Sequence, residues 1–392
     1  MGDSADCIIV EPARSAEEAG LTYVTDEEPG ITRRRAGKGF VYRDAKGRRI
    51  TDAGELARLR QLAIPPGWTR VWIASDPRGH LQATGRDARG RKQHRYHPDW
   101  HAASDEVKFN RMQEFGRALP RIREQVDRDM RGKPLARRTV LATIVRLLET
   151  TLIRIGNEEY AKQNESFGLT TLRDEHVQER GRELLLEFKG KSGKLHSVRV
   201  HDRRARRIIK STQDLPGQDL FQYVDEEGEQ QKVTSRDVND YLQEISGKPL
   251  TAKDFRTFAA TVMAAWALHE FEQFDSRAKC KRNVRQAIET VARRLGNTPA
   301  VCRKSYVHPE VFDAFLDGSL RATLRDRVEE NLRDELGGLR PEEAAVLAFL
   351  QKRLALQVED KLDDAEPESE RGLANALAKS LRGNAAPSAT LR

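Results

Sequence analysis

The chain has 392 residues, enough for two domains that each bury a core of their own. Its 69 Lys and Arg against 61 Asp and Glu leave a net charge of +8 in a sequence that is 33% charged. Such a composition argues against a membrane-spanning protein, because no apolar run approaches the roughly 20 residues that cross a bilayer, and it favours a polyanionic partner.

The three cysteines, Cys7, Cys280 and Cys302, are scattered and show no CxxC spacing. Structural zinc sites and disulfide frameworks require closely spaced or paired cysteines, so neither is expected. The sequence also lacks a Walker A motif and a cluster of Asp and Glu at metal-binding spacing. We therefore expect a cytoplasmic protein that uses no cofactor and no metal.

The first part of the chain is expected to be a flexible lead over residues 1–20 and a small antiparallel β domain over residues 21–100. GFVYRD and RRITD flank turn residues 45–47 and predict a hairpin. Asp52 is a candidate N-cap for the helix that follows. TRVWIAS and HLQATG, joined by a Pro- and Gly-containing turn at residues 76–79, predict a second hairpin.

A basic stretch with interleaved amide and aromatic side chains follows, from Gly85 to Trp100. Cations can hold DNA phosphates, and amides and aromatic rings can meet sugars or base edges. The stretch predicts a loop that contacts DNA, although a solvated loop anchored by Trp100 has the same composition. The candidate DNA-binding residues here are Arg91, Lys92, Gln93, His94 and Tyr96.

Residues 101–358 are expected to form a mainly helical domain. Apolar residues from Leu141 to Leu152 recur at helical spacing and predict a long amphipathic helix that ends at Gly156. Arg154 would then lie near the helix terminus, where an arginine also complements the helix dipole. Its position is therefore open to a structural as well as a functional explanation.

A short three-stranded sheet is expected inside this helical domain, from TTLRDEHV, RELLLEF and KLHSVRV. The turn between the second and third strands places Lys191 at a hairpin tip, where a lysine is commonly just solvated. Further on, Lys253 and Arg256 lie three residues apart in the first turns of a predicted helix, hence on one face. Because cations oppose the dipole at a helix start, an anionic ligand explains this pair better than helix stability does.

The stretch LGNTPAVCRKSYVHP, residues 295–309, contains Asn297 and then Tyr306 beside two cations. A tyrosine with its ordinary pKa of about 10 is a poor nucleophile, so covalent use of Tyr306 requires a positively charged site. An ordinary helix start at Pro309 with a tyrosine packed in the core fits this stretch too. The acidic, then Ala- and Ser-rich residues 359–392 are expected to be a disordered tail.

Taken together, RIGNEEY, the lysine after glycine at the hairpin tip, KDFRTF, LGNTPAV and KSY resemble the active-site blocks of type IB DNA topoisomerases, specifically the small poxvirus-like bacterial branch. The resemblance extends from about Tyr23 to Leu356. It implies an α+β fold related to tyrosine recombinases, with a small antiparallel β-rich N-terminal domain and a mainly α-helical catalytic domain that holds a short three-stranded sheet. Together these domains would form a bilobed clamp on DNA.

The resemblance implies relaxation of supercoiled duplex DNA through a transient 3′-phosphotyrosyl link, without ATP or metal. Tyr306 would be the nucleophile, and Arg154 and Arg256 would bind the nonbridging phosphate oxygens. Lys191 would be the general acid for the leaving 5′-oxygen. Asn297 stands where many relatives carry a histidine, and its amide N–H can donate the same hydrogen bond without carrying charge.

The same resemblance relates GRKQHRYH to a DNA-contacting GRKQYxY block, with His94 in place of a tyrosine, and implies a DNA contact for Lys253. We expect a nucleoid-associated monomer whose partner is double-stranded DNA. One alternative is a tyrosine recombinase, whose second-arginine block normally begins with a histidine where Lys253 stands. The other is a catalytically silent DNA-binding protein, which would have no reason to keep all five catalytic positions filled.

Overall fold

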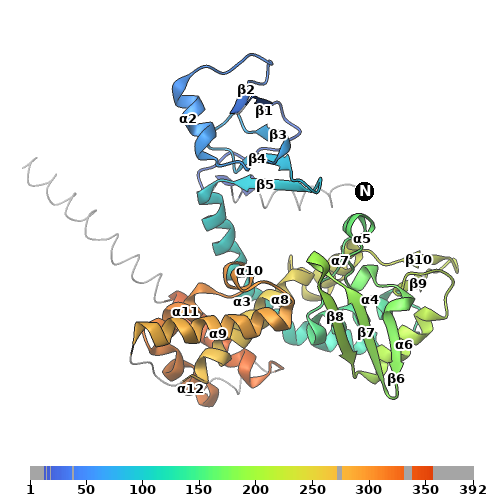
Figure 1. Ribbon diagram of the computed structural model, residues 1–392. Coiled ribbons are helices and arrows are strands. Elements are labelled where there is room, and N and C mark those ends of the chain that lie inside the picture. Colours follow the sequence, from blue (N-terminus) through green and yellow to red (C-terminus); the bar gives the residue numbers. More distant parts are fainter. Residues whose placement is uncertain are drawn as a thin grey trace, which may run out of the picture. The chain divides into compact units, whose positions relative to one another are not determined.

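The computed structural model describes residues 13–355, apart from residues 15, 18, 38, 272–275 and 331–337. The chain divides into two compact units, with the break between Asn110 and Arg111 (Figure 1). The expected flexible lead lies mostly outside the described residues, and the expected disordered tail lies entirely outside them. The domain boundaries taken from the sequence therefore stay predictions.

The first unit is built on a five-stranded antiparallel sheet with the order β2-β1-β3-β4-β5. Its helix, α2 (Ala53–Gln61), begins at the predicted N-cap, where the Asp52 carboxylate accepts a hydrogen bond of 2.7 Å from the backbone N–H of Glu55. The predicted small antiparallel β domain is thus confirmed. The strands are β1 (Ile31–Ala36), β2 (Gly39–Arg43), β3 (Thr69–Ile73), β4 (Leu81–Arg86) and β5 (Lys92–Tyr96).

The predicted pairing of GFVYRD with RRITD is present but short: Arg43 bridges Arg49, and the Ile50 N–H donates to the Tyr42 carbonyl oxygen at 3.0 Å. Strand β2 also pairs with β1, which was not predicted because its basic sequence ITRRRA shows no apolar alternation. Ile31 and Arg33 are both buried, and the Arg33 guanidinium donates to the carbonyl oxygens of Ile64 and Pro65 at 2.9 and 2.8 Å. A buried arginine that satisfies backbone carbonyls therefore occupies a position where the sequence pattern leads one to expect an apolar residue.

The predicted DNA-contacting loop is wrong in its conformation, because part of it forms a strand. A turn at residues 87–91 leads into strand β5, and helix α3 (Pro98–Asp129) begins two residues after that strand ends. Strand β5 has no apolar face, and its backbone pairing with β4, from Arg86 opposite Lys92 to Leu81 opposite Tyr96, holds it in the sheet. Its polar sequence carries no strand signal of its own.

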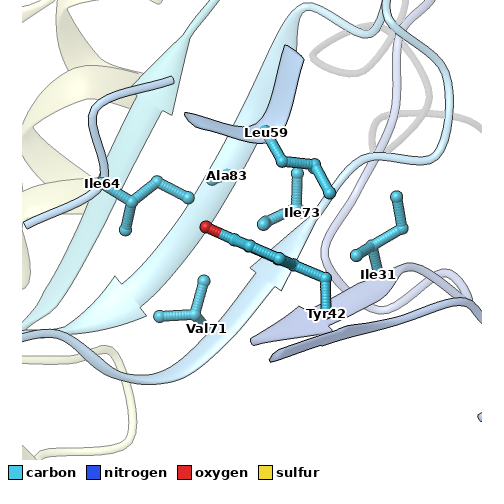
Figure 2. Packing of buried hydrophobic residues seen from close by; sticks show 7 residues of the cluster. All are labelled: Ile31, Tyr42, Leu59, Ile64, Val71, Ile73 and Ala83. Atoms are coloured by element: carbon cyan, nitrogen blue, oxygen red, sulfur yellow. The ribbon is translucent and has the colours of Figure 1, made fainter. Parts of the chain in front are cut away.

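Helix α2 covers one face of this sheet and closes a small apolar core. Leu59 on the helix packs against side chains of the strands, and the ring of Tyr42 extends among them (Figure 2). The buried cluster consists of Ile31, Tyr42, Leu59, Ile64, Val71, Ile73 and Ala83.

The second unit is mainly helical and contains the predicted three-stranded sheet, with the order β6-β7-β8. Its first predicted strand is shorter than expected, because TTLRDEH forms two short 3₁₀ turns before β6 begins at Val177. Strands β6 (Val177–Arg180), β7 (Glu183–Lys189) and β8 (Leu195–Val200) are followed by a small pair, β9 (Gln222–Val224) and β10 (Gln230–Lys232).

After α3, the helices of this unit are α4 (Arg137–Thr151), α5 (Glu158–Asn164), α6 (Arg203–Gln213), α7 (Ser235–Ser246), α8 (Ala252–His269), α9 (Arg277–Leu295), α10 (Pro299–Ser305), α11 (Pro309–Leu316) and α12 (Ser319–Glu330). Helix α4 is largely buried, and α6, α7 and α8 pack against it. Residues 341–355 form a closing helix. Among the helices that the structure describes, none is both long enough and apolar enough to cross a membrane.

Helix α4 ends earlier than the sequence predicts. Leu152 adopts the left-handed conformation with φ 57° directly after Thr151, the last residue of the helix, so the helix ends five residues before Gly156. Arg154 therefore lies beyond the helix, in a segment without regular secondary structure, and the helix-dipole explanation for its position is removed. A leucine in this conformation carries a steric cost of about 1–2 kcal/mol, which is why the sequence gives no warning of it.

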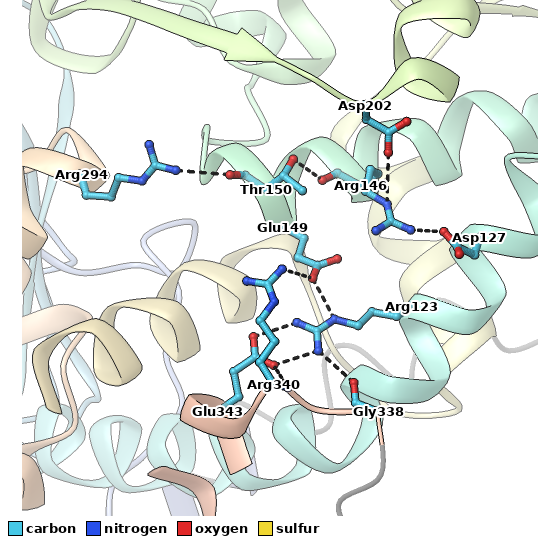
Figure 3. Close-up of polar contacts among 10 residues, drawn as sticks. All are labelled: Arg123, Asp127, Arg146, Glu149, Thr150, Asp202, Arg294, Gly338, Arg340 and Glu343. Atoms are coloured by element: carbon cyan, nitrogen blue, oxygen red, sulfur yellow. Dashed lines mark hydrogen bonds and ion pairs between the residues drawn. The ribbon is translucent and has the colours of Figure 1, made fainter. Parts of the chain in front are cut away.

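A charged network ties α4 to the helices around it (Figure 3). Arg123 of α3 donates to Glu149 of α4 at 2.8 Å and to Glu343 of the closing helix at 2.7 Å. Arg340 lies 3.4 Å from the same Glu149, and Arg294 of α9 donates to the Thr150 carbonyl oxygen at 3.4 Å. The glutamates are thus paired where they are largely buried, as charged groups in that position must be.

We expect Ile73→Ala to destabilise the first unit by about 2–5 kcal/mol, because it leaves a cavity beside a side chain with no exposed surface. Tryptophan fluorescence during urea unfolding measures this, since three of the four tryptophans, Trp68, Trp72 and Trp100, lie in that unit. Arg34→Ala, at an exposed position of β1, is the control and should change stability by less than about 0.5 kcal/mol. Equal losses in both variants would contradict the assigned core.

Candidate active site

The start of helix α8 is fixed by the predicted capping interaction. The Asp254 carboxylate accepts hydrogen bonds from the Thr251 N–H at 2.7 Å and from the Thr251 hydroxyl at 2.9 Å. This cap sets the direction of the first turns. Lys253 and Arg256, three residues apart, both line one cavity, as their spacing predicts, with Lys253 exposed and Arg256 buried.

Arg256 is held between the ends of two other helices. Its Nη1 donates to the Leu152 carbonyl oxygen beyond α4, and its Nη2 donates to the Leu295 carbonyl oxygen of α9 at 2.8 Å. Its side chain is almost fully buried, and its Nε has no hydrogen-bond partner among the residues that the structure describes. Burial and the neighbouring Arg154 lower the pKa of Arg256, but a guanidinium retains its charge at neutral pH.

Tyr306 follows helix α10 directly and is half-buried beside Arg256, whose guanidinium carbon lies 5.3 Å from the centre of the tyrosine ring. Its backbone is held on both sides: its N–H donates to the Cys302 carbonyl at 3.1 Å, and its carbonyl accepts from the Thr261 hydroxyl at 3.2 Å. Tyr306 lines the cavity, so the alternative of a tyrosine packed in the core does not hold.

The surroundings of Tyr306 favour its ionised form. Burial raises the pKa of the phenol, but the charges of Arg256 and Arg154, a hydrogen bond from Arg256 and the charge of Lys253 together outweigh it. The net effect is a pKa below the ordinary value of 10. A phenol in this setting is a better nucleophile at neutral pH than a free tyrosine.

Asn297 lies behind Arg154 and is not part of the cavity lining. Its side-chain oxygen accepts a hydrogen bond from Nη2 of Arg154, which orients the amide. Asn297 is 7% exposed, and its Nδ2 has no partner in the described part of the chain. A buried donor without a partner is costly, and this one lies next to Arg154, which does line the cavity.

The hairpin between β7 and β8 carries three lysines close to the cavity. Lys191 lines it. Lys194 instead donates from Nζ to the Asn297 carbonyl oxygen at 2.9 Å, and Lys189 lies 4.0 Å from Glu165. Of these three lysines, Lys191 is therefore the one that lines the same cavity as Tyr306.

The cavity measures about 390 Å³ and gathers four cations together with the phenols of Tyr160 and Tyr306. Among the described residues, no Asp or Glu contributes to its wall. The lining consists of Arg154, Ile155, Gly156, Asn157, Tyr160, Ser166, Phe167, Lys191, Ala252, Lys253, Arg256 and Tyr306. Such an arrangement can bind a phosphodiester, spread its charge over fixed donors and place a nucleophile beside it.

Two residues of the cavity wall, Tyr160 and Phe167, were not predicted from the sequence. Tyr160 lies in the block RIGNEEY, and the side chain of Asn157 accepts a hydrogen bond of 2.8 Å from its backbone N–H at the start of α5. Its place in the same sequence block as Arg154 could have indicated that Tyr160 lies near the site. Phe167 lies in a loop that has no pattern of its own, and only the fold brings it to the cavity.

The candidate DNA-binding residues of the first unit lie on and beside strand β5. Alternation places Lys92, His94 and Tyr96 on one face, where the rings of His94 and Tyr96 stack with centroids 5.9 Å apart. Lys92 is paired with Asp26 at 2.7 Å.

On the other face, Arg91 and Gln93 share one carboxylate. The Arg91 guanidinium pairs with Asp87 at 2.7 Å, and the Gln93 amide donates to the same oxygen at 3.0 Å. Within the residues that the structure describes, no group of three or more His, Cys, Asp and Glu side chains is arranged to hold a metal ion.

Comparison with known proteins identifies relatives over most of the chain. A family model of the catalytic core of eukaryotic DNA topoisomerase I matches residues 97–323, and one of the N-terminal domain of bacterial DNA topoisomerase IB matches residues 39–87. DNA topoisomerase 1B of Acanthamoeba polyphaga mimivirus is 35% identical over 285 residues, which cover 71% of this chain and 85% of the relative. DNA topoisomerase 1B of vaccinia virus (strain Copenhagen) is 23% identical over 270 residues, covering 66% and 81%.

We expect Arg154→Ala to raise the pKa of Tyr306, because it removes one of the two guanidinium charges that lower it. Ultraviolet difference absorbance of the phenolate during a pH titration measures this, with Tyr306→Phe subtracted to isolate one tyrosine from seven. Arg204→Ala, on the exposed side of α6, is the matched loss of a guanidinium and should leave this titration unchanged. A titration of Tyr306 above pH 10 in the unaltered protein would contradict the assigned electrostatics.

Proposed function

This chain belongs to the type IB DNA topoisomerases, and we propose that Tyr306 is the nucleophile with which it cleaves and rejoins one strand of duplex DNA. The observation that carries the proposal is the phenol of Tyr306, half-buried in a cavity with four cations and a pKa below its ordinary value. Relaxation of supercoiled DNA follows, because the cleaved strand can rotate before it is rejoined.

In the cleavage step the Tyr306 oxygen attacks the scissile phosphorus, and the phenolic proton leaves to solvent. The bond from phosphorus to the 5′-oxygen breaks as the bond to tyrosine forms. Lys191 protonates the departing oxygen, giving a 3′-phosphotyrosyl link and a free 5′-hydroxyl. Religation is the reverse. The energy of the broken bond is kept in the new phosphodiester, so the cycle needs no ATP.

Arg154 and Arg256 would bind the nonbridging oxygens of the phosphate. Both Nη atoms of Arg256 already donate to backbone carbonyls, so its Nε–H and remaining N–H groups are the ones available to the substrate. The Asn297 amide, turned by Arg154, would add one uncharged donor. Fixed donors of this kind stabilise charge in the transition state without having to reorganise.

Duplex DNA is the substrate that the family implies, and we propose that both units contact it as a clamp. Lys253 in the cavity wall and the face of β5 that carries Lys92, His94 and Tyr96 are the proposed contacts, with Arg91 and Gln93 beside them. We also propose that the enzyme acts as a monomer at the nucleoid. The relatives reported above are all named DNA topoisomerases, which does not favour a recombinase or a silent DNA-binding protein.

We expect Tyr306→Phe to bind duplex DNA nearly as well as the unaltered enzyme but to form no covalent adduct, because only the nucleophilic oxygen is lost. Relaxation of a supercoiled plasmid in EDTA without ATP, with a denaturing gel for protein-linked DNA, measures both properties. Tyr223→Phe, on β9, is the control and should relax normally. Continued relaxation by Tyr306→Phe would remove the proposed nucleophile.

We expect Lys191→Ala to slow cleavage by about 10²-fold or more, the usual size of a general-acid effect. Replacing the bridging 5′-oxygen with sulfur should largely abolish this defect, because a thiolate with a conjugate-acid pKa of about 8.5 departs without a proton. Single-turnover cleavage of the two substrates measures the difference. Lys189→Ala, at the same hairpin, is the matched control. Equal slowing of Lys191→Ala on both strands would make Lys191 a phosphate-binding residue.

A further inference from the structure

The ring of His196 lies between the two segments that carry Lys191 and Asn297. His196 is the second residue of β8 and pairs with Phe188 across the hairpin, where the two rings stack with centroids 5.0 Å apart and an angle of 9° between their planes. Stacking of this kind fixes the plane of the imidazole. The ring is half-buried and is not part of the cavity wall that holds Tyr306.

The edge of the His196 ring lies against two glycines, and each glycine directly precedes a proposed site residue. A Cβ added to Gly190, before Lys191, would lie 2.5 Å from Cδ2 of His196. One added to Gly296, before Asn297, would lie 2.7 Å from Cε1 of the same ring. Contacts this short leave no room for any side chain at either glycine, so the imidazole fills the space between the hairpin tip and the turn after α9.

From this arrangement we infer that His196 is a positioning residue, which holds the hairpin tip against the turn after α9 and thereby keeps Lys191 in the cavity. The inference rests on the proposed role of Lys191 as general acid. Asn297 has other anchors, since its N–H donates to the Ala292 carbonyl at 2.9 Å and its side chain accepts from Arg154. The hairpin tip is therefore the side that moves when the ring is removed.

The charges near His196 agree with a role as an uncharged spacer. Burial, followed by the charges of Arg154, Arg256 and Lys194, lowers the pKa of the imidazole. The ring is thus neutral at physiological pH and adds no repulsion to the cationic site. Lys194 spans the same gap by donating to the Asn297 carbonyl oxygen, and it supplies the polar half of the contact that His196 completes by packing.

The test is single-turnover cleavage of duplexes with oxygen or sulfur at the bridging 5′ position. His196→Ala should slow cleavage of the oxygen strand by about tenfold to 10²-fold, the cost of a catalytic group displaced by about 1 Å. On the sulfur strand its rate should return to within about threefold of the unaltered enzyme, since no acid is then needed. His196→Phe, which keeps a flat ring between the glycines, should retain most of the rate on both strands.

Gly190→Ala provides a second variant that does not remove the histidine. The backbone of Gly190 has φ −93°, which alanine tolerates, so the added methyl group acts mainly by pushing the ring and the hairpin tip apart. Gly190→Ala should also cleave the oxygen strand slowly and recover its rate on the sulfur strand. His176→Ala is the matched control, because that ring also packs near Phe188, at 6.3 Å, and its loss should give no defect that depends on the bridging atom.

Two outcomes would overturn the inference while leaving the proposed function intact. One is a His196→Ala enzyme as fast as the unaltered enzyme on the oxygen strand. The other is a His196→Ala defect of equal size on both strands, in an experiment in which the Lys191→Ala defect largely disappears on the sulfur strand. If the Lys191→Ala defect persists on the sulfur strand, Lys191 is not the general acid, and the positioning role of His196 is contradicted as well.

Discussion

The guanidinium of Arg256 is the interaction on which the rest of the catalytic unit depends. It donates to the carbonyl oxygens of Leu152 and Leu295 and lies beside the ring of Tyr306, so one buried cation joins the ends of α4 and α9 to the proposed nucleophile. Burying a charge is costly unless it is hydrogen-bonded. The early, left-handed end of α4 at Leu152 supplies one of the required carbonyls, and the cation proposed to bind the phosphate thereby also has a structural role.

Much of this arrangement can be predicted from the sequence where local chemistry decides the structure. The Asp52 and Thr251 helix starts follow from capping, and the hairpin that carries Lys191 follows from alternating strands around a glycine-rich turn. The buried α4 follows from its apolar spacing. The five proposed catalytic residues were chosen by their motif context, and four of them line one cavity.

The features that could not be predicted depend on tertiary contacts. Strand β5 has no apolar face, so only its partner β4 makes it a strand. The end of α4 at Leu152 contradicts the intrinsic preference of leucine, and it places the Leu152 carbonyl where it accepts a hydrogen bond from Arg256. The place of Asn297, behind Arg154 and outside the cavity wall, and the packing of His196 against two glycines cannot be read from spacing.

In its proposed role as a phosphate donor, the uncharged amide of Asn297 makes this position of the site insensitive to acidity. A histidine with its ordinary pKa of about 6.5 would be partly protonated over the range in which the interior of a cell varies, and the positive charge around a bound phosphate would change with it. An amide holds that charge constant. A cell that becomes more acidic under stress would therefore keep an undiminished capacity, at this position, to release the torsional strain that transcription and replication build up in its chromosome.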